Sequence, residues 1–452
     1  MKKFTRILIC LLLCVFGFAL AACDSRSTKE KAFTYPSKND IVSGNGGMAV
    51  QKGNYIYFVN GYKSITSSEV TQNGTYTHAG LMLTRLVDGE LSVDENGSLV
   101  EDDYIFITNR LAGFEATNLW INGEYLYFTT QAQGNKGGDD AKNGNKVWAK
   151  ELVEFYKVKL DKTSAPVRLY QTKDTYSNIE FKFYNTADET IILVHEKSSK
   201  KLVRVAGGKA TEISVDGVAL AENIENCYYI VNDTANSRYV LNKFNGKTNK
   251  STEIEARSSS FELKFVSDDY VYILSTRSIG GNSYKDLEKA SVAGGSFSYV
   301  TYDVANYTLF ASSDSVILAV KDNSIKLFRD GSVYAAATIT DEDAEKINVV
   351  GLTNGSVVYY VENSSKKSLK MVSYFNMLQS GDTEILTLVD ETSDLQTVYF
   401  DLDGSYVYFY KKVGEHNYLF RVAFGNVEQT KEELVGVYLK ADIPETEETT
   451  EE

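Results

Sequence analysis

The sequence predicts an all-β protein, a β-propeller of eight blades with four antiparallel strands in each blade. Three observations lead to this prediction. A β-forming run recurs along the chain, its spacing matches one blade, and a second β-forming run follows each copy. A single four-stranded sheet cannot bury both of its faces, whereas blades arranged in a ring cover one another.

The recurring run is a turn residue followed by aromatic and β-branched side chains, which favour strands. Clear copies occupy residues 53–58, 123–128, 269–273 and 404–409. Weaker copies occupy residues 190–193, 228–231, 316–318 and 357–360. We therefore expect eight second strands, whose Tyr and Phe side chains fill the space between blades.

Most runs are followed by an apolar, a basic and an apolar residue, as at 83–86, 155–158, 202–205, 369–372 and 419–422. One unit can be interpreted completely, with strands expected at 178–185, 190–194, 201–205 and 211–215. Residues 307–339 repeat that order. Four strands joined by short hairpins form one propeller blade.

The spacing of the second strands supports the blade count. From residue 190 onward they begin 38, 42, 46, 41 and 49 residues apart, close to a blade of about 40–45 residues. The earlier gaps, of 70 and 65 residues, contain polar insertions at 61–80 and 131–146. One misread copy reduces the count to seven blades. The alternative architectures are a β-sandwich or a series of β-rich modules.

The first 22 residues have the three parts of a secretory signal. Three basic residues precede 14 apolar residues at 7–20, fewer than the roughly 20 that span a bilayer, and Ala21 and Ala22 follow. The tetrapeptide at 20–23, Leu-Ala-Ala-Cys, resembles the lipobox of bacterial lipoproteins. This resemblance implies cleavage before Cys23 and diacylglycerol on its thiol, and two acyl chains anchor a protein stably. The alternative is an ordinary signal peptide with an accidental cysteine.

The rest of the chain divides into a flexible polar tether at 23–45, the propeller at 46–440 and an acidic disordered tail at 441–452. Cys10 and Cys14 lie in the signal, so Cys227 is the only thiol besides Cys23 and we expect no internal disulfide. We therefore expect an exported protein, anchored by lipid to the outer face of the cell membrane, most simply in a Gram-positive bacterium.

The β-forming runs and their Leu-x-Arg-Val followers, as at 419–422, resemble a family of propeller domains in lipoproteins of Firmicutes-type bacteria. That family is in turn similar to the YWTD propellers of lipoprotein receptors, although this chain lacks the Tyr-Trp-Thr-Asp tetrad. The resemblance extends over residues 46–440. It implies a fold and no particular activity.

The net charge is acidic. Removal of the first 22 residues, which carry three basic and no acidic side chains, leaves 44 Lys and Arg against 61 Asp and Glu, a net charge of −17. Nucleic acids and anionic lipid headgroups are bound by clustered basic residues, so neither is expected as the main partner. An acidic surface also keeps a protein soluble.

No motif indicates catalysis, a metal site or a cofactor. The three histidines, His78, His195 and His416, lie in different units without metal-ligand spacing, and no Gly-x-Ser-x-Gly occurs. The insertions are the better candidates, because loops on a rigid scaffold carry binding residues. The first insertion contains Tyr62, Tyr76 and His78, and Trp148 lies at the end of the second insertion. If both insertions lie on one rim of the ring, we expect these residues to form a lip over the central channel.

These features favour a lipoprotein, held on the membrane through Cys23, whose propeller is a binding or scaffolding module for a protein, peptide or glycan. The alternative is a propeller enzyme, a hydrolase or lyase, acting on extracellular carbohydrate with paired carboxylates. The enzyme requires carboxylates from different blades to converge, one with a raised pKa. The binding module requires an exposed aromatic patch on a rim.

Overall fold

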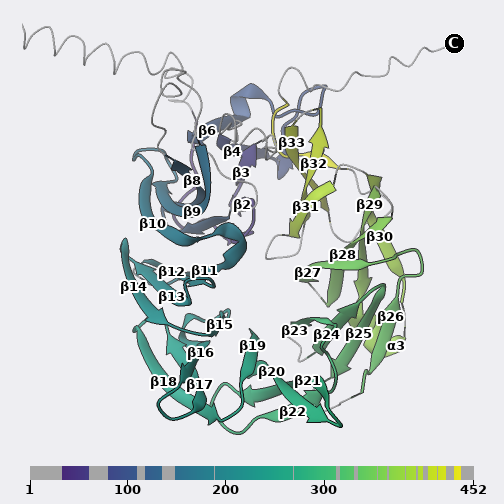
Figure 1. Cartoon of the computed structure of the whole chain (residues 1–452). Helices are drawn as coiled ribbons and strands as arrows, with labels where there is room; N and C mark the ends of the chain where they lie inside the picture. The colour runs from purple at the N-terminus through teal and green to yellow at the C-terminus, as the bar shows by residue number, and fades with distance from the viewer. Residues whose placement is uncertain are drawn as a thin grey trace, which may run out of the picture.

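The computed structural model describes residues 33–60, 80–108, 118–134, 148–187, 189–267, 269–311, 316–329, 334–353, 355–363, 366–381, 383–392, 395–400, 406–414, 416–423 and 432–438. These residues form eight antiparallel sheets around a ring, so the predicted eight-bladed propeller is confirmed (Figure 1). Seven sheets have four strands, and the first sheet has six.

Blades 1 to 4 come from the first half of the chain. Blade 1 contains β1 (Val42–Ser43), β2 (Ala49–Lys52), β3 (Tyr55–Asn60), β4 (Gly80–Val87), β5 (Glu90–Leu91) and β6 (Tyr104–Thr108). Blade 2 contains β7 (Leu119–Asn122), β8 (Tyr125–Gly134), β9 (Trp148–Lys159) and β10 (Val167–Thr175). Blade 3 contains β11 (Ile179–Asn185), β12 (Thr190–Glu196), β13 (Lys201–Ala206) and β14 (Lys209–Ser214). Blade 4 contains β15 (Gly217–Ala219), β16 (Cys227–Asp233), β17 (Arg238–Asn245) and β18 (Lys250–Arg257).

Blades 5 to 8 complete the ring. Blade 5 contains β19 (Phe261–Val266), β20 (Tyr270–Ile279), β21 (Asn282–Ser291) and β22 (Ser298–Thr301). Blade 6 contains β23 (Thr308–Ala311), β24 (Val316–Lys321), β25 (Ser324–Arg329) and β26 (Ala337–Thr340). Blade 7 contains β27 (Ile347–Thr353), β28 (Ser356–Asn363), β29 (Lys366–Ser373) and β30 (Ile385–Thr392). Blade 8 contains β31 (Leu395–Phe400), β32 (Tyr406–Val413), β33 (His416–Ala423) and β34 (Glu433–Leu434).

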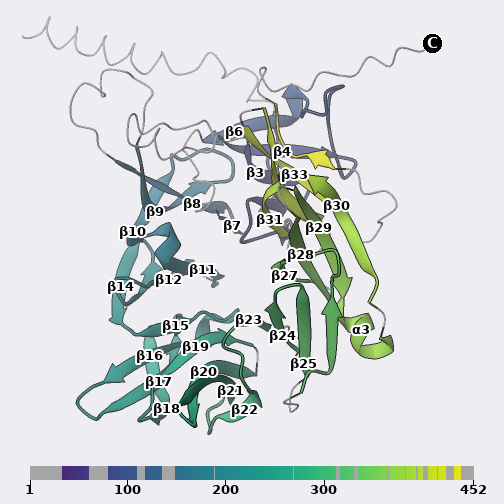
Figure 2. The same ribbon diagram turned by 45° about the vertical axis from the view of Figure 1, so that its right-hand side comes forward.

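The second strands confirm the repeat. Each of the eight begins within one residue of its predicted position. In blades 3 to 8 the first strand lies toward the inside of the ring and the fourth at its outer edge (Figures 1 and 2). Helical structure in the described residues is confined to α3 (Tyr374–Ser380), between β29 and β30, and three short 3-10 turns.

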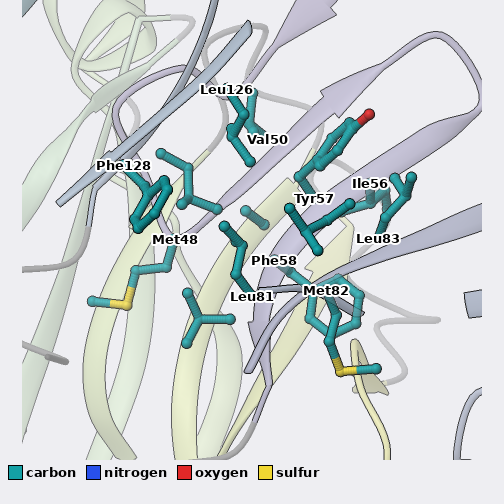
Figure 3. Close-up of a cluster of buried hydrophobic side chains, with 14 of the residues drawn as sticks. Met48, Val50, Ile56, Tyr57, Phe58, Leu81, Met82, Leu83, Leu126 and Phe128 are labelled. Atoms are coloured by element: carbon teal, nitrogen blue, oxygen red, sulfur yellow. The ribbon is translucent and has the colours of Figure 1, made fainter. Parts of the chain in front are cut away.

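The hydrophobic core lies between the blades. Each of the seven clusters of buried apolar side chains joins neighbouring blades, as where Phe155 of blade 2 packs against Phe183 and Ile192 of blade 3. Tyr57 and Phe58 of β3 meet Leu126 and Phe128 of blade 2 in the cluster drawn in Figure 3. The prediction that second-strand aromatics fill the space between blades is therefore confirmed.

The direction of the strands defines two faces of the ring. Antiparallel strands reverse at each turn, so connections from second to third strands and from one blade to the next emerge on one face. We call this face the 2–3 face. Connections from first to second and from third to fourth strands emerge on the opposite face.

Residues 33–45, which we expected in a flexible tether, lie against blade 1 instead. β1 pairs with β2, and the Phe33 ring meets the Tyr55 ring edge-on with centroids 6.2 Å apart. Lys52 is 1% exposed, and its Nζ donates hydrogen bonds to the carbonyl oxygens of Lys38 and Asp40 at 3.1 and 3.0 Å. The buried ammonium needs these acceptors, so this segment belongs to the folded domain.

Candidate functional site

The site residues expected from the sequence fall mostly outside the described residues. This applies to Cys23 and to Tyr62, Tyr76 and His78 of the first insertion. Trp148 is the first residue of β9, and its side chain is not described.

The strand ends that flank the two insertions do lie on one face. Residues 61–79 connect β3 to β4, and residues 135–147 connect β8 to β9. Both are connections from a second to a third strand, so the chain enters and leaves each insertion on the 2–3 face. The lip formed by these insertions remains a prediction.

Blade 5 also projects on the 2–3 face. Strands β20 and β21 pair through to Ile279 and Asn282, past the residues that pair with β19 and β22. The tip is a two-residue turn, Gly280-Gly281, with φ of +60° and +85°. Glycine adopts this backbone conformation without strain, and the turn type matches the twist of a hairpin.

The sequence analysis missed a cluster of three tyrosines and one arginine at this hairpin, in which Arg277 and Tyr284 lie on β20 and β21, Tyr299 lies on β22 and Tyr302 directly follows β22. Tyr299 and Tyr302 are 48% and 47% exposed, and their ring centroids lie 5.2 Å apart. The Arg277 guanidinium lies 5.1 Å from the Tyr284 ring centroid and 5.4 Å from that of Tyr302. We call Arg277, Tyr284, Tyr299 and Tyr302 the blade 5 cluster.

A buried carboxylate fixes the arginine of this cluster. Arg277 donates to the two Asp286 oxygens at 2.5 and 3.2 Å, and the Asp286 side chain is fully buried. Burial acts to raise the pKa of Asp286, but hydrogen bonds from Arg277 and the Asp303 amide outweigh it and lower that pKa. The pair is thus nearly neutral as a unit, and the half-exposed Tyr299 and Tyr302 lie beside it.

A recess on the same face of the ring lies between blades 6 and 7. It has a volume of about 530 Å³ and is lined by both first strands, β23 and β27. The Lys321–Asp322 end of β24 and the Lys346–Ile347 start of β27 form its edges. Its size falls in the range of small-molecule sites, roughly 300–1,000 Å³.

The carboxylates on first strands are paired with cations. Glu180 of β11 contacts Lys197 at 2.6 Å and His195 at 3.7 Å, and the proximity of His195, together with the ion pair to Lys197, lowers the pKa of Glu180 to about 2. Glu262 of β19 binds Lys285 at 2.6 Å and Lys264 at 3.3 Å, and the Lys285 hydrogen bond lowers its pKa despite desolvation. For every described carboxylate whose pKa is shifted, the shift is downward.

The other residues considered from sequence have structural surroundings. Cys227 is a buried free thiol beside the Tyr184 hydroxyl, at 3.3 Å. The Asp94 carboxylate closes its own turn by accepting from the amides of Asn96 and Ser98. Within the described ranges, no three His, Cys, Asp or Glu side chains come together as a metal site. Nor does any helix there have the length and apolar character to cross a membrane.

Comparison with known proteins finds only distant similarity to solved structures. No family model matches the chain, and no curated protein matches it. Among solved structures, the β-propeller domain of the Trilobed protease from Pyrococcus furiosus, described as having an open velcro topology, is 13% identical with a TM-score of 0.40. The match covers 86% of this chain and 95% of that chain.

Two further structures illustrate how varied the matches are. A eukaryotic initiation factor is 9% identical with a TM-score of 0.45, covering 89% of this chain and 92% of that chain. The acylaminoacyl peptidase of Pyrococcus horikoshii is 14% identical with a TM-score of 0.41, covering 90% of this chain and 54% of that chain. Likeness at this level transfers no activity to this chain.

Proposed function

We propose that this chain is a lipoprotein of the cell envelope, anchored through Cys23, whose propeller binds a protein, peptide or glycan partner with its 2–3 face. The blade 5 cluster is the observation that carries the binding part of this proposal. It presents two half-exposed tyrosines, one on β22 and one directly after it, beside a hairpin that projects on the face from which both insertions leave. The lipobox-like tetrapeptide at 20–23 supports the anchor.

The chemistry of the cluster suits binding. Tyrosine supplies a large, rigid contact area with few rotatable bonds and a hydroxyl at its end, so ordering it on binding costs little entropy. The Asp286 carboxylate and the flanking rings already hold the Arg277 side chain. A partner therefore meets a pre-ordered surface, which favours affinity.

The hydrolase alternative receives no support from the described carboxylates. Acid catalysis on a glycoside requires one carboxyl group with a raised pKa near a second, ionised one. Glu180 and Glu262, which lie on the first strands of different blades, both pair with cations that lower their pKa. These two carboxylates therefore do not provide the pair that this enzyme requires.

Crosslinking in intact cells tests the binding proposal. We expect the unaltered chain to give specific adducts that a Tyr299→Ala/Tyr302→Ala variant loses. Tyr334→Ala is the matched control, because Tyr334 is 81% exposed and lies between β25 and β26, on the opposite face. Equal adducts from the unaltered chain and the Tyr299/Tyr302 variant would contradict a binding role for blade 5.

Cell fractionation tests the anchor separately. We expect the unaltered chain in the membrane fraction with incorporated labelled fatty acid, and a Cys23→Ala variant without label and released from the membrane. Label that persists in the Cys23→Ala variant would show that the anchor is elsewhere.

A further inference from the structure

The recess between blades 6 and 7 combines an apolar floor with two cationic side chains at its mouth. Phe310, Val320, Ile347 and Val349 form the floor. Val320 and Ile347 belong to the buried cluster between the two blades, with Phe310 and Val349 packed against it. The floor is thus part of the rigid interface between blades.

The polar groups of the recess surround this floor. Asn306 and Thr308 lie on the side of blade 6, and Asn348 and Tyr360 on the side of blade 7. Amide and hydroxyl groups donate and accept hydrogen bonds, so this set suits a ligand with several hydroxyl groups. Phe310 offers an aromatic surface to the apolar face of a sugar ring.

The two lysines at the mouth differ from Lys370 in having no carboxylate partner among the described residues. Lys370, in the same interface, is held by Asp341 at 2.9 Å. Within the described ranges, by contrast, no Asp or Glu oxygen lies within ion-pairing distance of the Nζ of Lys321 or Lys346. The Lys321 ammonium lies only near the Tyr307 ring, 5.8 Å from its centroid.

The charges of the lining indicate a ligand with a single negative charge. Lys321 and Lys346 contribute two positive charges and Asp322 one negative charge, which leaves a net positive charge of one. A carboxylate balances this charge, whereas a phosphate monoester carries about −1.5 to −2. Asp322 remains as an acceptor for a ligand hydroxyl.

We propose that the recess between blades 6 and 7 binds an acidic sugar, with its carboxylate between Lys321 and Lys346 and its ring on Phe310. The free monosaccharide and the same sugar within a glycan share this chemistry. The site lies on different blades from the blade 5 cluster, and it needs neither that cluster nor the lipid anchor.

Calorimetric titration of the purified full-length chain in detergent tests this proposal. The probes are glucuronate, a glucuronate-containing disaccharide, glucose and glucose 6-phosphate. We expect glucuronate to bind at least tenfold more tightly than glucose and glucose 6-phosphate. Tighter binding of the disaccharide than of glucuronate identifies a glycan as the source, and the reverse order identifies the free sugar.

Variants locate the site. We expect Lys321→Gln/Lys346→Gln to weaken glucuronate binding by about a hundredfold, since each of the two charge-assisted hydrogen bonds is worth roughly one factor of ten. Asn348→Phe, which fills the recess and keeps both lysines, should also abolish binding. Lys250→Gln, at an exposed lysine on β18, should bind as the unaltered chain does. Thermal unfolding of each variant checks that it is folded.

Three results would overturn the proposal. The first is no glucuronate binding by the unaltered chain, or binding no tighter than that of glucose. The second is tighter binding of glucose 6-phosphate, which would reject the carboxylate. The third is unchanged binding in the folded lysine variant, which would reject the location. None of them bears on the crosslinks at Tyr299 and Tyr302, so the two proposals fail separately.

Discussion

The interface between blades 6 and 7 and the interface between blades 8 and 1 both bury apolar side chains, but they differ in their polar contacts. At the first, Asp341 follows β26 of blade 6 and accepts hydrogen bonds from Lys370 and Tyr359 of blade 7, with distances of 2.9 to 3.1 Å. At the second, where the two ends of the domain meet, Asn60 of blade 1 bonds to the backbone of Val437, with its Oδ1 2.8 Å from the amide and its Nδ2 3.3 Å from the carbonyl oxygen.

The difference reflects how each interface is connected. Blades 6 and 7 are adjacent in sequence, so forming their interface closes only a short loop. Blades 8 and 1 join residues 377 positions apart, and each described sheet consists of strands from one stretch of chain. Among the described residues, the ring thus closes through side chains and short backbone contacts, and no strand is shared between the two ends. We expect the closing interface to open more readily than the interior one.

Loss of Lys370 should have the largest effect. Asp341 is buried, with 1% of its surface exposed, and Lys370→Met leaves its carboxylate without a cationic partner. Removal of one partner from a buried ion pair costs about 3–5 kcal/mol of unfolding free energy. Chemical denaturation, followed by tyrosine fluorescence or circular dichroism, measures that loss.

The double variant Asp341→Asn/Lys370→Met sharpens this test. The asparagine keeps an acceptor near the Tyr359 hydroxyl, and no charge is left unpaired. We expect the double variant to be more stable than Lys370→Met alone, because the ion pair as a unit contributes little net stability. Equal losses in the single and double variants would show that the cost comes from packing.

Much of the fold was predictable because a single repeated pattern, a β-forming second strand in each blade, specifies it. The period of about 40 residues and the β-forming second strands follow from residues such as Tyr57, Tyr272 and Tyr359, each buried between blades. The folding of residues 33–45 against blade 1 was not predictable. Lys38 and Asp40 bind Lys52 through their backbone carbonyl oxygens, and because every residue has such an oxygen, the side chains in the sequence do not indicate the contact. Helix α3 was missed although Ser373 caps its start and Gly381, at φ +77°, ends it.

The candidate sites were less predictable than the fold. Tyr299 and Tyr302 are typical strand residues in sequence, and the sequence does not show that they lie on and just after β22, the edge strand of blade 5, beside Arg277. The Gly280-Gly281 turn, flanked by two β-forming runs, was the available signal for that hairpin. The recess between blades 6 and 7 brings together Asn306 and Tyr360, and only the packing of the blades sets the space between them.

Disruption of the Asn60 contact should have the second largest effect. Asn60→Ala leaves the amide and carbonyl groups of Val437 without this partner, at a cost of about 1–3 kcal/mol. Gly436→Ala should act on the same contact, because a Cβ there would clash with the Asn60 Oδ1. We expect the double variant to lose much less than the sum of the two single losses, as measured by urea denaturation. Additive losses would contradict the shared contact.

The smallest expected effect distinguishes the two kinds of interface most directly. Tyr410→Phe removes a buried hydroxyl that donates to the Val59 carbonyl oxygen at 3.1 Å across the closing interface, and should cost about 0.5–1.5 kcal/mol. Tyr57→Phe is the control, because the Tyr57 hydroxyl bonds to the Leu160 carbonyl oxygen across the interior interface between blades 1 and 2. Hydrogen exchange should show faster opening of β3 and β32 in Tyr410→Phe and little local change in Tyr57→Phe. Equal exchange in both variants would mean that the closure is as firm as any other interface, although it joins the two ends of the domain.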